Sequence, residues 1–138
     1  MLNFNKVINW YDNWRREKIT DVRSLFACQY IKVFFIVTLA VNICLWAAVY
    51  YMIAQMPNEQ IALHYNVDFG IDYYGTIGQI YIMPALGLII FIFNCCLLLA
   101  TNRRQDAKIL HYLLMTTSLS ANLILAASLI SIYLINSR

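Results

Sequence analysis

The residues best suited to chemistry lie in a short stretch between two long apolar segments. His64, Asn66, Asp68 and Asp72 would share one face of an extended strand. Such a group could bind a cation or a polar ligand. The alternative is that these residues form the solvent-exposed face of a half-buried strand, in which asparagine and aspartate start a turn near Gly70. We favour this alternative, because a metal site normally needs more ligands than one histidine and scattered carboxylates.

A second pair, Asp106 and His111, is close enough in the chain for acid–base work. No nucleophile, glycine-rich phosphate loop or further ionisable group inside an apolar segment accompanies it. We therefore expect His111 to be interfacial, near the start of the third apolar segment, and we expect no catalysis, ion pumping or cofactor. Four cysteines in or beside apolar segments predict free thiols without a disulfide or a metal: Cys28, Cys44, Cys95 and Cys96.

Three apolar segments must position these residues. The 138-residue chain is 62% hydrophobic and only 12% charged, outside the range of ordinary soluble domains. Residues 33–56, 77–100 and 109–135 contain no Asp, Glu, Lys or Arg. At about 1.5 Å per residue, each segment exceeds the roughly 30 Å thickness of the hydrocarbon core. The sequence therefore predicts a single all-α membrane domain with three transmembrane helices.

The distribution of Lys and Arg predicts the orientation of these helices. Six of these residues precede the first span, three lie in the loop 101–108, and none lies in the loop 57–76. We therefore expect the N-terminus in the cytoplasm, with the loop 57–76 and the C-terminus on the other side of the membrane. Because the cations adjoin apolar segments rather than exposed aromatic and polar loops, they predict no nucleic-acid partner.

Residues 1–32 form a separate cytoplasmic element. Phe4, Val7, Ile8, Tyr11 and Trp14 recur at helical spacing, which predicts an amphipathic helix. Tryptophans beside cations suit a helix at the headgroup level of an anionic leaflet, so the lipid bilayer is an expected partner. The residues expected to contact the membrane surface are Trp10, Trp14, Arg15, Arg16 and Lys18.

The loop 57–76 alternates apolar and polar residues from Ile61 to Tyr73, a period of two that predicts extended structure. A lone strand leaves its backbone groups unpaired, so this stretch either folds back near residues 68–70 or pairs with another chain. The alternative is an irregular loop whose apolar side chains rest on the membrane surface. In the extended form, we expect the apolar face to rest on the helices or on lipid, and Gly70 and Gly75 to set the shape.

Small residues form faces on two of the predicted helices and permit close packing. They are Ala40, Cys44 and Ala47 in the first span, and Ser120, Ala127 and Ser131 in the third. We expect these faces to pack within one bundle, and a dedicated interface with another subunit is the alternative. Asn42 and Asn94 are expected to form hydrogen bonds between helices.

Between residues 56 and 90, a proline leads to a histidine, an aromatic residue, an asparagine and a glycine, and then to a second glycine and a proline within the next apolar segment. The positions are Pro57, His64, Tyr65, Asn66, Gly70, Gly75 and Pro84. This pattern resembles the N-terminal segment of the SdpI family, bacterial membrane proteins named for immunity to a sporulation-delaying toxin. The resemblance implies a non-enzymatic, multi-pass protein of the plasma (inner) membrane.

Two function classes follow. The first is a membrane protein of SdpI-like type that binds a ligand, a peptide or a protein partner through the loop 57–76. The loop residues expected to make this contact are His64, Tyr65, Asn66, Asp68, Gly70, Asp72 and Gly75. The second class is a structural or accessory subunit of a larger membrane complex, or a homo-oligomer. The mass of the detergent-extracted protein discriminates the classes, because a monomer favours the first and a defined assembly the second.

Cysteine labelling from outside the cell tests the orientation. A cysteine introduced at Asn58 should react with a membrane-impermeant maleimide, whereas one introduced at Gln105 should react only after the membrane is permeabilised. The unsubstituted chain, with its four native cysteines, gives the background. The reverse labelling pattern would place the loop 57–76 in the cytoplasm and contradict the prediction.

Overall fold

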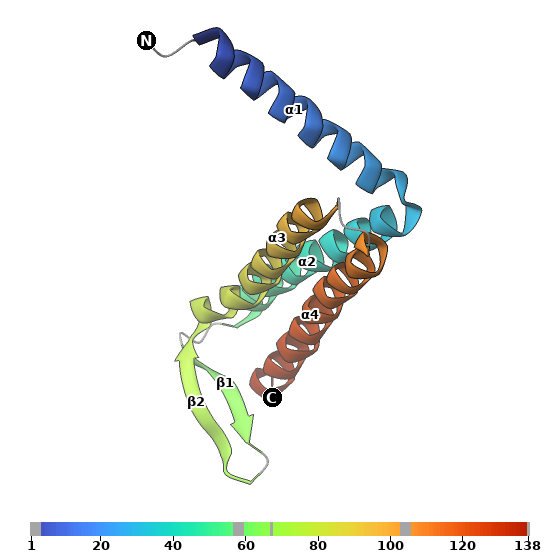
Figure 1. The fold of residues 1–138 in the computed structure, drawn as a ribbon. Helices are drawn as coiled ribbons and strands as arrows, with labels where there is room; N and C mark the ends of the chain where they lie inside the picture. The colour runs from blue at the N-terminus through green and yellow to red at the C-terminus, as the bar shows by residue number, and fades with distance from the viewer. Residues whose placement is uncertain (1–3, 57–59, 67, 103–105, 138) are drawn as a thin grey trace.

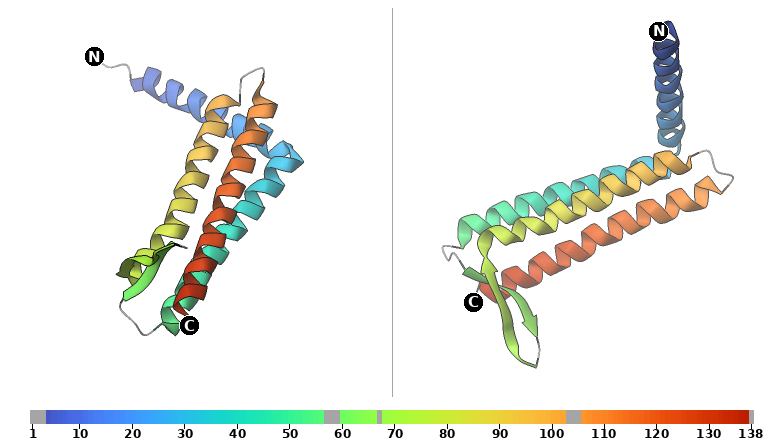
Figure 2. Two further views of the ribbon diagram at one scale, coloured as in Figure 1. Left: turned by 90° about the horizontal axis from the view of Figure 1, so that it is seen from below. Right: turned by 60° about the vertical axis from the view of Figure 1, so that its left-hand side comes forward.

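A computed structural model of the chain describes residues 4–56, 60–66, 68–102 and 106–137. Three long helices lie side by side as a bundle (Figures 1 and 2). A fourth helix, at the N-terminus, projects from one end of this bundle, and a two-stranded sheet lies at the other end. In chain order the elements are α1 (Phe4–Ala27), α2 (Gln29–Gln55), β1 (Gln60–Asn66), β2 (Gly70–Thr76), the 3-10 helix η1 (Ile77–Tyr81), α3 (Ile82–Thr101) and α4 (Ala107–Asn136).

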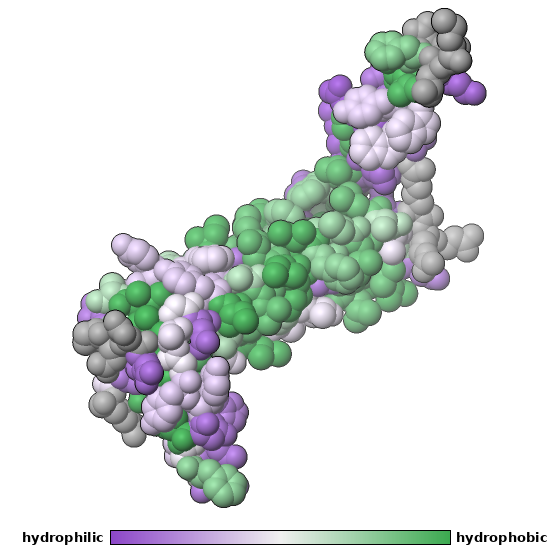
Figure 3. Space-filling view, turned by 90° about the vertical axis from the view of Figure 1, so that its left-hand side faces the viewer, coloured by the Kyte–Doolittle hydropathy of each residue, from purple (hydrophilic) through white to green (hydrophobic). Residues whose placement is uncertain are grey.

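Three helices of the described chain are long and apolar enough to cross a membrane, as the sequence predicted. They comprise Gln29–Gln55, Ile77–Thr101 with its 3-10 start, and Ala107–Asn136. Apolar side chains cover the middle of the molecule, and polar ones gather toward both ends (Figure 3). This distribution matches a hydrocarbon layer between two aqueous phases. The first span begins earlier than predicted, at Gln29, because the chain bends at Cys28 and not at the first uncharged residue.

Two buried asparagine side chains join the three helices of the bundle. Asn42 of α2 donates from Nδ2 to the carbonyl of Pro84 in α3 and to Oδ1 of Asn122 in α4, both at 3.0 Å. Asn122 in turn donates to the carbonyl of Gly87 in α3 at 3.3 Å and to that of Ser118 in its own helix at 3.0 Å. A hydrogen bond between helices replaces the water that lipid excludes. These amides therefore fix the register of all three helices.

Gly87 allows the backbone of α3 to lie close to the side chains of Asn42 and Asn122. A Cβ at this position would lie 2.5 Å from Oδ1 of Asn122 and 2.9 Å from Nδ2 of Asn42, closer than Cβ atoms come to other groups. The absence of a side chain thus lets the backbone of α3 reach both amides. Pro84 lies in the first turn of α3, where its missing N–H removes no bond from the helix interior.

The prediction that small residues pack within the bundle is wrong. All six residues are exposed on the surface of the helices: Ala40, Cys44, Ala47, Ser120, Ala127 and Ser131. The buried positions of α2 and α4 hold large aliphatic side chains, such as Leu45, Val49 and Leu129, and two other small residues, Thr38 and Ser118. Small residues permit another helix to pack closely at their position, but their spacing does not identify which helix packs there.

Only one of the two asparagines predicted to link helices does so. Asn42 bridges to α3 and α4, as expected. Asn94 is buried in α3, but its amide donates at 2.9 Å to the carbonyl of Ile90 one turn earlier in the same helix. Asn122, which the sequence analysis did not select, takes the bridging role.

Replacing Asn122 by alanine removes the amide that α2 and α3 share. We expect Asn122→Ala to lower the free energy of unfolding by about 1–2 kcal/mol, because two bonds between helices are lost in lipid. The measurement is unfolding of the protein in mixed micelles with increasing SDS. Asn94→Ala is the matched control, since it removes a buried amide bonded within α3. Equal losses for both variants would contradict the bridging role.

Candidate functional site

The predicted strand folds back on itself as an antiparallel hairpin, so the irregular loop is not what this chain forms. The pairing runs from Gln60 with Thr76 to Asn66 with Gly70. At the tip, Oδ1 of Asn66 accepts a hydrogen bond from the backbone N–H of Asp68 at 2.9 Å, which starts the turn. Gly70 closes it with a φ of +79°, a conformation that side chains disfavour. Asn66 and Gly70 therefore have turn roles.

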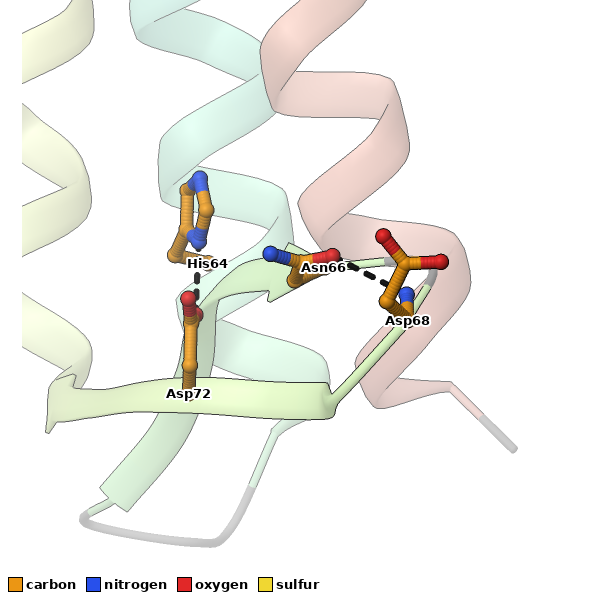
Figure 4. Close-up of polar contacts among 4 residues, drawn as sticks. All are labelled: His64, Asn66, Asp68 and Asp72. Atoms are coloured by element: carbon orange, nitrogen blue, oxygen red, sulfur yellow. Dashed lines mark hydrogen bonds and ion pairs between the residues drawn. The ribbon is translucent and has the colours of Figure 1, made fainter.

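The two strands are out of step by one residue over a short stretch. His64 is opposite Tyr73 and Tyr65 is opposite Ile71, so Asp72 has no direct partner in the register, and Leu63 is passed over on the other strand. In the register of the rest of the hairpin His64 and Asp72 would be direct partners, and they stay in contact across this irregularity, with Nδ1 of His64 2.6 Å from Oδ1 of Asp72 (Figure 4). The His64 and Asp72 side chains are 65% and 41% exposed, so water screens the pair and it adds little to stability.

The four polar residues of the predicted binding face form two separate pairs. His64 and Asp72 meet across the strands, whereas Asn66 turns toward the backbone of Asp68 at the tip (Figure 4). Within the described residues, no three His, Cys, Asp or Glu side chains gather closely enough to hold a metal ion. The hairpin thus offers hydrogen-bonding groups and charge at its surface.

Asn136, in the last turn of α4, holds the hairpin on the bundle. Its Oδ1 accepts from the N–H of Ala62 at 2.8 Å, and its Nδ2 donates to the carbonyl of Ala62 at 2.9 Å. The side-chain amide therefore pairs with β1 as the peptide group of a further strand would. Ile61 and Ala62 are each 2% exposed, and Ile61 joins the cluster of Leu45, Val49 and Ile132.

Beyond this base, the apolar face of the hairpin does not rest on the helices. The aromatic side chains toward its tip are exposed, from Tyr65 at 51% to Phe69 at 84%. Tyr73 and Tyr74 of β2 are also exposed. Of the two surfaces expected to cover this face, the helices cover only its base, because only the first residues of β1 reach the helix ends. The exposed aromatic surface remains open to lipid or to a partner.

An open pocket of about 370 Å³ lies where β2 meets the start of α3. Leu63, Tyr73, Gln79, Ile80 and Met83 are among its lining residues. Gly75 lies at this corner without a positive φ, and a Cβ there would meet the ends of the Gln79 and Leu63 side chains, which can shift aside. The expectation that Gly75 sets the shape of the loop through its backbone angle is therefore wrong, and Gly70 alone has such an angle among the described glycines.

Two other predicted features have different outcomes. All four cysteines are free thiols, as expected. His111 was expected at the membrane interface but is 4% exposed, inside the bundle near the start of α4. A ring nitrogen of His111 is bonded to the backbone of Leu98 in α3, while Nε2 has no partner among the described residues. His111 therefore packs between α4 and α3.

The residues predicted to contact the membrane surface all lie on α1. This helix spans 24 residues and is exposed along most of its length. It contacts the bundle at its C-terminal end, where Leu25 is buried and Asn102, directly after α3, donates at 3.0 Å to Oγ of Ser24. The remainder projects sideways from the bundle (Figure 2). Trp10, Trp14, Arg15, Arg16 and Lys18 occupy this projecting part.

Asn136→Leu tests how the hairpin is held, because leucine keeps the shape of the side chain and removes both bonds to Ala62. We expect the exchange rate of the Ala62 amide to rise about tenfold, equivalent to roughly 1.4 kcal/mol. Hydrogen exchange of the detergent-solubilised protein measures this. Ser137→Ala is the control, since its hydroxyl bonds only within α4. Unchanged protection at Ala62 would show that apolar packing alone holds the hairpin.

Comparison of the chain with protein-family models, with curated proteins and with solved structures finds no match. The similarity of residues 56–90 to the SdpI family therefore stays a prediction from the residues named above.

Proposed function

We propose that this chain is a non-enzymatic membrane protein that binds a peptide or protein partner through its hairpin, on the extracytoplasmic side of the plasma membrane. The observation that carries the proposal is a hairpin anchored at its base and bare at its tip. Asn136 and the buried Ile61 fix its position, while Phe69, Tyr73 and Tyr74 are exposed. Aromatic side chains of this kind are enriched in protein interfaces, because they bury large area at low entropic cost.

The orientation follows from charge. The loop that contains the hairpin has no Lys or Arg, whereas nine of the ten Lys and Arg residues of the chain lie in residues 1–32 or 101–108, at the other end of the spans. This bias supports a hairpin outside and an N-terminal helix in the cytoplasm. A fixed platform on the outer face suits capture of a partner, since an ordered surface loses little entropy on binding.

Photo-crosslinking tests the proposal. A benzoylphenylalanine at Phe69 should give a discrete protein adduct in the membrane of the organism that makes this chain, because Phe69 is the most exposed apolar residue at the tip. The control position is Ile124, which is exposed on α4 and faces lipid in a monomer. Adducts at neither position, or one adduct common to both, would contradict binding through the hairpin.

A second candidate function is that of an accessory subunit or a homo-oligomer. A specific observation favours it: the exposed small residues Ala40 and Cys44 line an apolar groove of about 410 Å³ between α2 and α4, together with Ala48 and Ala126. Small residues at a helix surface let another helix approach closely. The mass of the protein in mild detergent separates the candidates, since a defined assembly would favour this one and a monomer the first.

We also propose that α1 lies on the cytoplasmic leaflet. Leu25 faces the bundle, and at about 100° per residue Val7, Tyr11 and Trp14 share its side of the helix within about 40°. That side faces the bilayer surrounding the bundle. Lys18 lies on it too, where its hydrocarbon stem would rest on apolar surface while the ammonium group reaches lipid phosphates.

Fluorescence quenching by lipids brominated near the headgroup measures the depth of α1. With Trp10 and Trp46 changed to phenylalanine, we expect strong quenching of Trp14 in anionic vesicles, because its face of the helix is turned toward lipid. The matched control moves the single tryptophan to Asn9, about 160° from Leu25, by adding Trp14→Phe and Asn9→Trp. Equal quenching at both positions would argue against a helix lying flat on the leaflet.

A further inference from the structure

We infer that the hairpin captures its partner by strand addition: an extended, cationic segment of another polypeptide pairs with the outer edge of β2. This inference rests on the proposed function and adds the chemistry of the partner and its mode of binding. Three features support it, namely the open edge of β2, the pocket between the hairpin and α3, and the acidic charge of the hairpin.

The two edges of the sheet differ. The outer edge of β1 is closed at its base, because the N–H and C=O of Ala62 are both bonded to the side chain of Asn136. The sheet has only two strands, and among the described residues no hydrogen bond joins the outer edge of β2 to another element. Alternate N–H and C=O groups from Gly70 to Thr76 therefore point outward without a protein partner. An added strand would pair with these groups.

The pocket of about 370 Å³ lies between the hairpin and the start of α3. Tyr73 of β2 and Leu63 of β1 line it on the hairpin side, together with Gln79 and Met83. In strand addition the backbone bonds supply affinity, while pockets that receive alternate side chains supply specificity. The size and the lining suit one aliphatic or aromatic side chain of the added strand, with the amide of Gln79 at the rim.

Charge identifies the partner as a different molecule from this chain. The segment 60–76 contains Asp68 and Asp72, no Lys and no Arg. A second copy would bring like charges together, whereas a segment that carries Lys or Arg would find opposite charge along the strand. Asp72 is 41% exposed beside its His64 partner, so its outer surface is accessible to a cation.

The test uses the full-length protein in nanodiscs of zwitterionic phosphatidylcholine, which gives a cationic peptide no anionic lipid to bind. The probe is a peptide of alternating lysine and valine, matched to the seven residues of β2. We expect it to bind, and to slow amide exchange at alternate positions of Gly70–Thr76 while β1 is unaffected. The same peptide with N-methyl groups on the amides of one edge should bind at least about tenfold more weakly, because it lacks those hydrogen-bond donors. A glutamate–valine peptide should show no binding.

Each contrary result overturns the inference in a distinct way. Equal binding of the N-methylated peptide would mean that side chains alone make the contact, and equal binding of the acidic peptide would remove the charge argument. Protection of β2 without any peptide would mean that the edge is already covered, by lipid if it is independent of protein concentration and by a second copy if it rises with concentration. Failure of the lysine–valine peptide alongside a discrete crosslink at Phe69 would reject strand addition and leave the proposed function standing.

Discussion

A bilayer offers no hydrogen bonds to the groups it surrounds, and this constraint determines where the polar side chains of the chain are placed. Backbone groups in the three spanning helices bond within each helix. The few amides that enter the interior must then find partners on neighbouring helices or on their own. Asn42 and Asn122 bond to each other and to carbonyls of α3, and these bonds set the relative positions of the helices along the bundle.

The same chemistry operates at the end of the bundle. A two-stranded hairpin is marginal on its own in water. Here an asparagine on a neighbouring helix supplies the missing bonds at its base, and two adjacent strand residues enter the apolar core. The anchored base leaves the opposite edge and the tip free. The hairpin is thus held in place by the outer edge of β1, while the outer edge of β2 has no bond to another element among the described residues.

The sequence predicts some features of this fold well because the solvent dictates them. Apolar length determines the spans, and the alternation in residues 60–76 determines extended structure regardless of what lies nearby. Other features depend on partners distant in the chain. Asn136 bonds to Ala62 across 74 positions, and no local pattern marks it. The meeting of His64 with Asp72 depends on where the hairpin folds back, and the alternation alone does not fix that position. The spacing of the small residues of α2 and α4 does not identify the helix that would contact them.

The bond between Asn136 and Ala62 also imposes an order on biogenesis. A chain is synthesised from its N-terminus, so the hairpin emerges before α4 exists, and its base cannot close until the final turn of the last span has been made and inserted. Until then Ile61 has no completed apolar surface to enter, since Leu129 and Ile132 belong to that span. The hairpin can therefore be anchored at its base only after all three spanning helices have been made and inserted. Only the fully inserted protein holds the hairpin in this fixed position, and a partially inserted chain lacks the bonds that anchor it.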